Sequence, residues 1–456
     1  MPERPNVLVI VADDLNDCIE GMDGHPQALT PQMSSLAESG VSFRRAYTNA
    51  PMCGPSRSSL FTGVYPHNSN NYFQAPWFDN EVLKNTRTMM EQFKASGYQV
   101  MGTGKILHHN QADIWTSFEN PADYGPSPFD GEEQLPHPDV PAPFSNLGWV
   151  DGSLGPFINL EGRTSPNGKA LSWTTGNDRR GYTPMRYIDD EDRDPTPDER
   201  NAAWAAEKIR ALSREPLEQP FFLAVGFLRP HTPLVAPQKY FDRFPLDQLK
   251  LAVIRSGDAD DTYLQVAYRG GDAHSLRLGR QMYEGIAEAY GGVEEGLKRW
   301  TQAYLACVAA VDDNIGQVLE ALDESPLRSN TIVVLTSDHG FHMGEKDYLY
   351  KNSLWEESTR VPLLMRVPGL TPPGTQVEHP VSLIDIYPTL VDLCGLSSQS
   401  AKNEKGHPLD GHSMRPLLED PATQTWKRPA ALTVVFAGEA YKDEPTMHHY
   451  AVSNQR

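Results

Sequence analysis

Four short apolar runs, each followed at once by ionisable residues, constrain the fold of this chain more than any other feature. The runs are residues 6–12 (NVLVIVA), 98–104 (YQVMGTG), 221–227 (FFLAVGF) and 331–337 (TIVVLTS). Short continuous apolar runs of this kind predict strands that are buried on both faces, as in a mostly parallel sheet.

Helical patterns lie between the apolar runs. Residues 30–40 begin with Thr30 as an N-cap and Pro31 in the first helical position. Residues 87–98 and 301–325 have the spacing of amphipathic helices. Because strands alternate with helices, we expect an α/β fold whose large, mostly parallel central sheet is flanked by helices.

The length of 456 residues predicts one large domain and a minor one. We expect the main α/β domain over residues 1–395. Residues 396–456 are expected to form a connector and the start of a small C-terminal α+β subdomain, short or truncated, because strand patterns occur at 428–436 and 448–456. Residues 110–200 are rich in Pro, Asp and Gly, and we expect them to form long surface loops.

Composition excludes several classes of partner. The formal net charge of −20 argues against a nucleic-acid or anionic-membrane surface, and no apolar run approaches the ~20 residues of a membrane span. The four cysteines are scattered without a CxxC pair, which argues against a disulfide framework or zinc knuckle. The first residues lack the features of a signal peptide, so we expect a cytoplasmic protein as written, or a periplasmic or secreted one if a leader was removed.

Ionisable residues follow each predicted strand. Ligands of open α/β sheets bind beyond the carboxyl ends of the strands, so we expect these residues to meet at one edge. Taken singly, an Asp-Asp pair is usually a turn or a helix cap, and a lone cysteine is usually a small buried apolar residue. The hypothesis of one shared site rests on the fact that all of these residues follow predicted strands. In chain order they are Asp13, Asp14, Lys105, His108, His109, Arg229, His231, Asp338, His339, Lys346 and Lys351.

The carboxylates predict a metal site. Asp13, Asp14 and Asp338 supply hard oxygen ligands, which suit Ca²⁺ or Mg²⁺. His339 is an unusual ligand for Ca²⁺, which prefers oxygen.

Cations and imidazoles surround the predicted metal. Lys105, Lys351 and Arg57 carry permanent positive charge, while His108 and His231 exchange protons near neutral pH. Such a set around a divalent ion suits a tetrahedral oxyanion, either sulfate or phosphate.

The segment PMCGPSRSSLFTG, residues 51–63, puts a lone cysteine where a helix begins. Cys53 and Arg57 are four residues apart, so they lie on one side of a helix. The amino terminus of a helix also favours an anion.

The sequence CGPSRSSLFTG is similar to the C-x-P-S-R-x-x-x-x-T-G signature of the type I sulfatase family, within the alkaline phosphatase superfamily. The resemblance covers most of the chain and includes PNVLVIVADD, TPQMSSLAESGVSFRRAYTNAPMCGPSR, YQVMGTGK, FFLAVGFLRPHTP, TIVVLTSDHG and VSLIDIYPTLVDLCGL. The chain most resembles iduronate-2-sulfatase-like members in its GKILHH spacing, its RPHTP segment, residues 351–369, and Asp338-His339 where many relatives carry Asp-Asn.

The resemblance implies a covalent modification and a metal. A formylglycine-generating enzyme would oxidise Cys53 to Cα-formylglycine, the nucleophile of the family. One Ca²⁺, with Mg²⁺ less favoured, would be held by Asp13, Asp14, Asp338, His339 and the modified Cys53.

The resemblance also implies roles for the cations and imidazoles. Arg57 and Lys105 would steady the nucleophile and the sulfate. His231 and Lys351 would help the alcohol leave, and His108 would take the proton that frees sulfate and regenerates the aldehyde.

The activity implied is removal of sulfate from a sulfated carbohydrate by an exo-sulfatase. A phosphonate or phosphate ester hydrolase of the same superfamily is the alternative, and a catalytically silent glycan-binding relative is the non-enzymatic reading. Residues predicted to touch the sugar are His109, Arg229, His342, Lys346 and Trp355.

Overall fold

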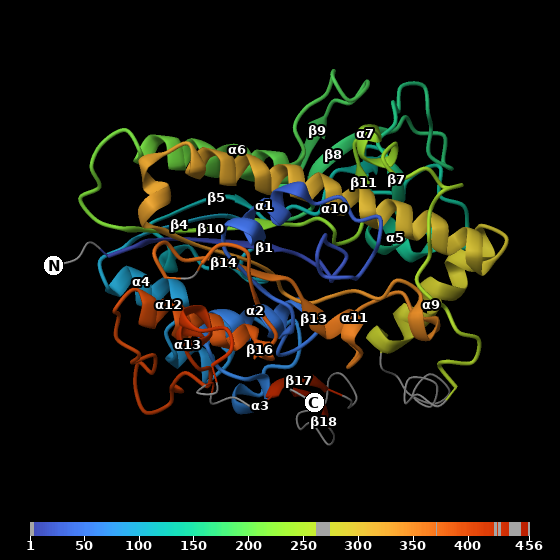
Figure 1. The fold of residues 1–456 in the computed structure, drawn as a ribbon. Helices are drawn as coiled ribbons and strands as arrows, with labels where there is room; N and C mark the ends of the chain where they lie inside the picture. Colours follow the sequence, from blue (N-terminus) through green and yellow to red (C-terminus); the bar gives the residue numbers. More distant parts are fainter. Residues whose placement is uncertain are drawn as a thin grey trace.

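The computed structural model describes residues 4–260, 274–370, 372–423, 426, 430–436 and 448–454. Within them, the largest sheet has the strand order β15-β2-β14-β12-β1-β10-β4-β5 (Figure 1). Its strands are β1 (Asn6–Ala12), β2 (Val41–Phe43), β4 (Gln99–Gly104), β5 (Ser117–Pro121), β10 (Phe221–Phe227), β12 (Thr331–Ser337), β14 (Leu363–Arg366) and β15 (Thr375–Val377).

The four predicted strands lie side by side at the centre of this sheet. β12, β1, β10 and β4 are mutually parallel, with Val7 beside Phe222 and Ile332. β14 runs antiparallel to both β12 and β2. The predicted α/β fold with a large, mostly parallel sheet is confirmed, and the carboxyl ends of its central strands lie at one edge.

Helices cover both faces of the sheet because successive side chains of a strand point to opposite faces. Leu8 and Ile10 of β1 pack in one core, and Val7 and Val9 pack in the other. The first core contains side chains of α1 (Pro31–Ser39), α6 (Pro197–Leu212), α9 (His274–Ala289) and α10 (Val293–Asp323), with α6 and α10 above the sheet in Figure 1. The second contains side chains of α2 (Cys53–Thr62), α4 (Met89–Ala95), α12 (Ile386–Leu393) and α13 (Arg415–Glu419).

The long helix α10 also positions the loop that follows β1. Tyr304 of α10 is fully buried, and its hydroxyl donates to the Asp14 carbonyl oxygen at 2.7 Å and accepts from the Asn16 backbone N–H at 3.0 Å. The helix begins at Val293, earlier than the predicted residue 301. A residue of the main core thereby fixes the backbone on which two predicted metal ligands stand.

Residues 110–200 contain more regular structure than the surface loops predicted there. β6 (Ser127–Phe129), β8 (Ser172–Asn177) and β9 (Gly181–Met185) form an antiparallel sheet with its own apolar cluster, in which Trp173 packs edge-on against Phe157. The strands are short and contain Pro or Gly, so their alternation is too brief to stand out in the sequence.

The predicted C-terminal strands are present as β17 (Ala430–Phe436) and β18 (His448–Asn454), an antiparallel pair. β17 contacts the main body through the Val434 backbone N–H, which donates to the Asn49 carbonyl oxygen at 3.0 Å. Part of the predicted subdomain over 396–456 lies outside the described residues, namely 424–425, 427–429, 437–447 and 455–456. The division at residue 395 therefore stays a prediction.

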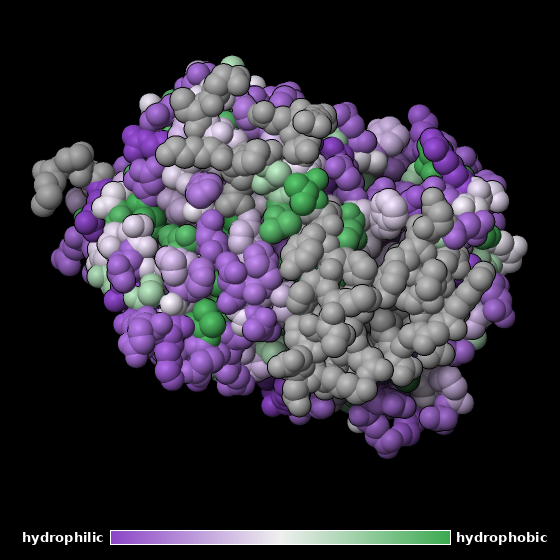
Figure 2. Space-filling model, turned by 90° about the horizontal axis from the view of Figure 1, so that it is seen from below, coloured by the Kyte–Doolittle hydropathy of each residue, from purple (hydrophilic) through white to green (hydrophobic). Residues whose placement is uncertain are grey.

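The surface below the sheet is mixed in polarity. Figure 2 shows mostly hydrophilic residues among the coloured parts of this face, with hydrophobic ones in small groups. Among the described helices, none combines the length and apolarity needed to cross a bilayer. This mixture is ordinary for a folded protein and singles out no docking face on the coloured part.

Candidate active site

The loops after β1 and β12 and the first residue of α2 bring four potential ligands together. One ligand atom from each of Asp13, Cys53, Asp338 and His339 lies within 4.8 Å of the others, and all four residues are buried. Asp13, Asp14, Cys53 and His231 form an overlapping group by the same measure. The structure therefore brings the five predicted metal-site residues into one cluster.

The loop after β1 is fixed by residues at the end of β12. The Asp14 backbone N–H donates to Asp338 Oδ1 at 3.2 Å, and the Leu15 N–H donates to the Ser337 hydroxyl at 3.0 Å. These contacts follow from the parallel pairing of β1 and β12 in register from Asn6 to Ala12. They hold the two carboxylate-bearing loops against one another.

Glycine lets β4 deliver Lys105 to the same place. Gly104 has φ +74°, and a Cβ atom there would lie 1.9 Å from the Gly226 carbonyl oxygen. That oxygen accepts from the Lys105 backbone N–H at 3.2 Å. Because only glycine fits this backbone turn beside β10, the last residue of the strand directs the lysine into the site.

Three buried cations pair with the three buried carboxylates. Arg57 donates from Nε to Asp338 Oδ2 at 2.8 Å and from a terminal nitrogen to Asp13 Oδ1 at 2.9 Å. Lys105 Nζ donates to Asp13 Oδ2, and Lys351 Nζ donates to both Asp14 oxygens at 2.7 and 2.9 Å. A buried carboxylate keeps its charge only when it is paired in this way.

The two adjacent aspartates have opposite pKa shifts. Burial alone raises the pKa of Asp13, but Lys105 and Arg57 hold that pKa well below its usual range. Burial raises the pKa of Asp14 to about 7, because Lys351 offsets only part of the burial effect. Asp13 is therefore ionised at neutral pH, while Asp14 titrates near neutral pH.

Cys53 lies between a cation and an imidazole. Its Sγ atom is 3.3 Å from Lys351 Nζ and 3.3 Å from His339 Nε2. Burial, reinforced by the charge of Asp13, raises the pKa of the Cys53 thiol. The unmodified thiol is therefore protonated near neutral pH, which makes it a weak nucleophile.

His339 is oriented so that one nitrogen faces the cluster. Nδ1 lies 3.0 Å from the Gly340 carbonyl oxygen, and because a carbonyl only accepts, Nδ1 carries the proton. Nε2 faces Cys53 Sγ, and in the tautomer with the proton on Nδ1 it presents its lone pair to the cluster. This arrangement is typical of histidines that bind metals.

The other two predicted histidines are kept neutral by burial. Burial and then Lys351 lower the pKa of His231 well below its usual range. His231 Nε2 lies 3.8 Å from Asp14 Oδ2, and its Nδ1 contacts the Thr232 carbonyl oxygen at 2.6 Å. Burial and then Lys105 lower the pKa of His108 to about 3. The buried His108 Nδ1 has no hydrogen-bond partner among the described residues.

The predicted sugar-contacting residues divide into two groups. Arg229 and His342 are buried: Arg229 donates to three carbonyl oxygens, and His342 Nε2 lies 2.6 Å from the Ser353 hydroxyl. Trp355 is 37 % exposed, and the Lys346 ammonium lies 4.4 Å from its ring centroid. His109 is partly exposed, with Nε2 2.7 Å from the Gln74 carbonyl oxygen.

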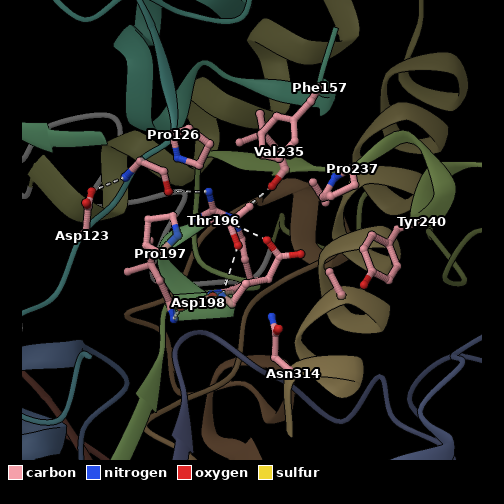
Figure 3. A pocket seen from close by; sticks show the side chains of 16 residues that line it. Asp123, Pro126, Phe157, Thr196, Pro197, Asp198, Val235, Pro237, Tyr240 and Asn314 are labelled. Carbon is pink, nitrogen blue, oxygen red and sulfur yellow. Dashed lines mark hydrogen bonds between the residues drawn. The ribbon is translucent and has the colours of Figure 1, made fainter. Parts of the chain in front are cut away.

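Leu228, Arg229 and Val235, which flank His231 in the chain, help to line a small cavity. Figure 3 shows this cavity with Val235 and Asp198 at its wall. Its volume of about 20 Å³ leaves room for a water molecule and is far below that of a sugar. Asp198 lines the cavity and accepts from the backbone N–H groups of Leu228 and Arg229 at 2.8 and 2.9 Å. The residues around this cavity therefore hold the turn that carries His231 in place, and the cavity is not a substrate site.

Sequence reasoning missed two residues at the site. Tyr124 accepts a hydrogen bond from Lys105 at 2.7 Å, and the Gln74 side chain accepts from the Gly54 backbone N–H at 2.7 Å. Both come from irregular segments without a motif or a periodic pattern. Their proximity to the site follows from chain topology that no local signal reports.

Comparison with known proteins places the chain in a family. The sequence model "Sulfatase" matches residues 5–396, and the model "N-sulphoglucosamine sulphohydrolase, C-terminal" matches residues 344–456. A "Sulfatase" of Formosa agariphila is 35% identical over 408 residues, which cover 88% of this chain and 71% of the relative. The iduronate 2-sulfatase of Mus musculus is 29% identical over 418 residues, covering 86% and 69%.

A solved structure shows the same fold. The phosphonate monoester hydrolase of Silicibacter pomeroyi superposes with a TM-score of 0.69 over 99% of this chain and 86% of its own, at 22% identity. At 22% identity, this similarity supports a shared fold and says nothing about activity. The family match over most of the chain, together with the Formosa relative, shows that this protein belongs to the Sulfatase family and is a sulfuric-ester hydrolase.

Proposed function

We propose that the chain is an exo-sulfatase that removes sulfate from a terminal sulfated sugar, with a formylglycine made from Cys53 and a bound Ca²⁺. The observation that carries this proposal is the position of Cys53 Sγ, within 3.3 Å of Lys351 Nζ and of His339 Nε2 and inside the carboxylate cluster. An aldehyde hydrate at this position would put oxygen atoms where the thiol now lies, and oxygen suits a hard cation.

The donor set fits a hard divalent cation. Asp13, Asp14 and Asp338 offer carboxylate oxygens in one buried cluster, and His339 turns an imidazole nitrogen toward the same cluster. Carboxylates favour Ca²⁺ or Mg²⁺, and the flexible coordination of Ca²⁺ accommodates a mixed set better than the strict octahedron of Mg²⁺. The cation would supply electrostatic stabilisation of the negative charge on the sulfate and the nucleophile.

The residues around Cys53 have complementary tasks. Arg57 donates to both Asp13 and Asp338 and so orients the two carboxylates. Lys351, beside Cys53 Sγ, is suited to donate a proton to the departing oxygen. The neutral His231 ring, whose Nε2 lies 3.8 Å from Asp14 Oδ2, would help to orient the ester next to this lysine. His108 is neutral, and its Nδ1 has no hydrogen-bond partner in the described part of the chain, so it can accept the proton whose removal releases sulfate.

Conversion of Cys53 would have to precede folding. Cys53 is 2 % exposed, and Pro55 and Arg57 of the same helix turn are buried as well. A formylglycine-generating enzyme could not reach these side chains in the folded protein, so it would act on the unfolded chain as a transient partner. Co-expression with such an enzyme would then raise the specific activity, whereas treatment of the folded protein would not.

A terminal sugar is the substrate class that the site favours. The catalytic side chains are buried, so a sulfate ester must enter a recess to reach Cys53, which suits a chain end better than the middle of a polymer. The net charge of −20 disfavours extended contact with a polyanion. Similarity to the mouse iduronate 2-sulfatase supports an iduronate-2-sulfatase-like specificity for a sulfated uronic acid.

Two measurements test the proposal. Mass spectrometry of the peptide that spans residues 51–63 should show a loss of about 18 Da relative to cysteine. Sulfate release from short sulfated oligosaccharides should exceed release from the intact polymer. An unconverted Cys53 in fully active enzyme, or turnover that survives Cys53→Ala, would overturn the proposed nucleophile.

A phosphonate or phosphate ester hydrolase is the second candidate function. A buried site of carboxylates and cations that suits a sulfate ester also suits a phosphonate or phosphate ester, because each presents a tetrahedral oxyanion. Parallel kinetics on 4-nitrophenyl sulfate and a 4-nitrophenyl phosphonate distinguish the two, and we expect a higher kcat/KM for the sulfate. The reverse order would favour the second candidate.

A further inference from the structure

We propose that Tyr124 is a positioning residue for sulfate-ester hydrolysis, one that fixes the Lys105 ammonium group and the ring of His231. The Tyr124 hydroxyl accepts a hydrogen bond from Lys105 Nζ at 2.7 Å, and the ammonium group lies 4.8 Å from the centroid of the tyrosine ring. The same ring packs edge-on against His231, with centroids 5.1 Å apart and planes at 83°. One side chain thus contacts two residues of the proposed machinery.

The contact with Tyr124 limits where the Lys105 ammonium can point. An ammonium group has three N–H donors. Asp13 accepts one of them and Tyr124 accepts another, from a different direction. With two donors held, the third has a fixed direction and is left for an anion in the site. Without the hydroxyl, the flexible lysine would be free to rotate about its bond with Asp13.

The His231 contact is of a different kind. His231 is held through Nδ1 by the carbonyl oxygen of the next residue, which leaves its Nε2 on the side of Asp14. Edge-to-face packing against Tyr124 restricts rotation of the imidazole ring from the other side. The tyrosine therefore contacts both the cation and the imidazole and limits the movement of each.

The segment that carries Tyr124 is itself anchored. Asp123 accepts from the Gly125 backbone N–H at 2.9 Å and from the Gly176 N–H of β8 at 3.0 Å. Arg229 donates to the Gly125 carbonyl oxygen at 3.3 Å and to the His231 carbonyl oxygen at 3.4 Å, so it joins the Tyr124 segment to the His231 turn. Figure 3 shows Asp123 and Pro126 beside the cavity that Asp198 also lines.

This network gives Arg229 a role different from sugar binding. Its guanidinium group is buried and spans three carbonyl oxygens, those of Gly125, His231 and Val235. Such an arginine ties segments of the chain together. The rigidity of this support is what allows Tyr124 to act on Lys105 and His231.

The test compares Tyr124→Phe with the parent enzyme on 4-nitrophenyl sulfate. Phenylalanine keeps the ring and removes only the hydroxyl. Since a hydrogen bond to a charged group is lost, we expect kcat/KM to fall about tenfold or more. Tyr124→Ala should fall further, because the contact with His231 is lost as well.

A double-mutant cycle separates positioning from a merely structural role. If Tyr124 acts through Lys105, then Tyr124→Phe should have little further effect on kcat/KM in the Lys105→Ala background. A structural role would lower activity by the same factor in both backgrounds. Independent, multiplicative effects would therefore overturn the inference.

A matched control is Tyr98→Phe. Tyr98 directly precedes β4, whereas Lys105 directly follows it. Tyr98 is buried, and its hydroxyl donates to the Pro5 carbonyl oxygen at 3.0 Å. We expect this variant to keep the kcat/KM of the parent while losing some thermal stability.

The inference rests on the proposed role of Lys105, and the outcomes distinguish the two. If Lys105→Ala keeps full activity, the proposed function of that lysine fails. If Lys105→Ala loses activity while a folded Tyr124→Phe equals the parent, the proposed function stands and the role of Tyr124 is overturned.

Discussion

Lys351 Nζ lies 3.3 Å from the Cys53 Sγ, although 298 residues separate the two in the chain. The same ammonium group donates to both oxygens of Asp14. One cation therefore contacts both a carboxylate that would bind the metal and the position at which the nucleophilic oxygen would replace the sulfur. Mutation of Lys351 can separate its contribution to protein stability from its contribution to activity.

Replacement of Lys351 by alanine should destabilise the protein. At pH 8, above the pKa of about 7, Asp14 is charged and would lose its cation in a fully buried site. Breaking a buried pair in this way costs about 3–5 kcal/mol. Urea unfolding of the metal-free protein measures the effect, and turnover should fall at least about a hundredfold.

The control for that variant is Lys84→Ala. Lys84 is 43% exposed and pairs with Glu81 on the surface, so its loss should leave both the unfolding free energy and turnover nearly unchanged. An unfolding free energy of Lys351→Ala equal to that of the parent would contradict the pairing with a charged Asp14.

Gly104→Ala tests how the strand edge delivers Lys105. Alanine at φ +74° costs about 1–2 kcal/mol by itself. Its Cβ would also lie 1.9 Å from the Gly226 oxygen, and relief of that overlap adds about 1–3 kcal/mol and displaces Lys105. We expect lower kcat/KM and a lower melting temperature.

Gly97→Ala isolates the backbone part of this effect. Gly97 has φ +86°, but a Cβ there would meet nothing within 4 Å. This variant should lose only the backbone contribution and keep its activity. Equal destabilisation by the two substitutions would show that the close approach to β10 is unimportant.

The central sheet could be predicted because its strands are unambiguous. Three of the four apolar runs, at 6–12, 221–227 and 331–337, coincide with β1, β10 and β12 residue for residue. Because these strands are buried on both faces, most residues in them are apolar, and the sequence shows an unbroken apolar run in each. The sheet β6-β8-β9 was missed since its short strands carry Pro and Gly and bury a small cluster of their own.

The site could be predicted where a residue follows a strand or belongs to a motif. Asp13 and Asp338 met these conditions, and the structure brings them together. Tyr124 met neither, because its place beside Lys105 depends on how residues 110–200 fold back over the sheet edge. The internal bonds of Arg229 were also beyond the sequence, since a cation next to a site looks the same whether it faces substrate or backbone.

His137 should make stability fall in acid. Its Nδ1 accepts from the Asp139 backbone N–H at 3.2 Å, and its Nε2–H donates to the Pro156 carbonyl oxygen at 2.9 Å, so the neutral ring is fully satisfied. Burial lowers the pKa of His137, an effect that outweighs the Pro156 bond and Asp139, and Arg163 lowers it further. The folded state then binds fewer protons than the unfolded state below pH about 6.5, where an unperturbed histidine titrates.

The sign of this linkage gives a measurable slope. Stability is retained above pH about 6.5 and is lost as pH falls toward the lowered pKa, by at most about 1.4 kcal/mol per pH unit for one proton. His137→Asn keeps an acceptor for the Asp139 N–H and removes the titration, so its unfolding free energy should depend less on pH between about 6.5 and 5. His25 has the same bonding pattern, to Gln27 and Lys250, and His25→Asn should behave alike. Parallel pH curves for parent and variants would contradict this account.

Removal and return of the metal test the carboxylate cluster most directly. The parent enzyme, dialysed against a chelator, should lose turnover and melt at a lower temperature, and Ca²⁺ should restore both. At a free Ca²⁺ concentration a hundred times the Kd, the gain in stability is about 2.7 kcal/mol. In Asp338→Asn the gain should shrink sharply, because a charged oxygen ligand is replaced by a neutral one.

A buried aspartate elsewhere provides the control for that experiment. Asp312 is fully buried in α10, where it accepts from the backbone N–H groups of Gln32 and Met33 at 3.0 and 2.9 Å. Asp312→Asn should lower stability with and without Ca²⁺ by the same amount, because it touches helix α1 and not the cluster. If Asp338→Asn and Asp312→Asn respond to Ca²⁺ alike, the cation binds somewhere other than beside Cys53, and the assignment of Asp13, Asp14 and Asp338 as its ligands fails.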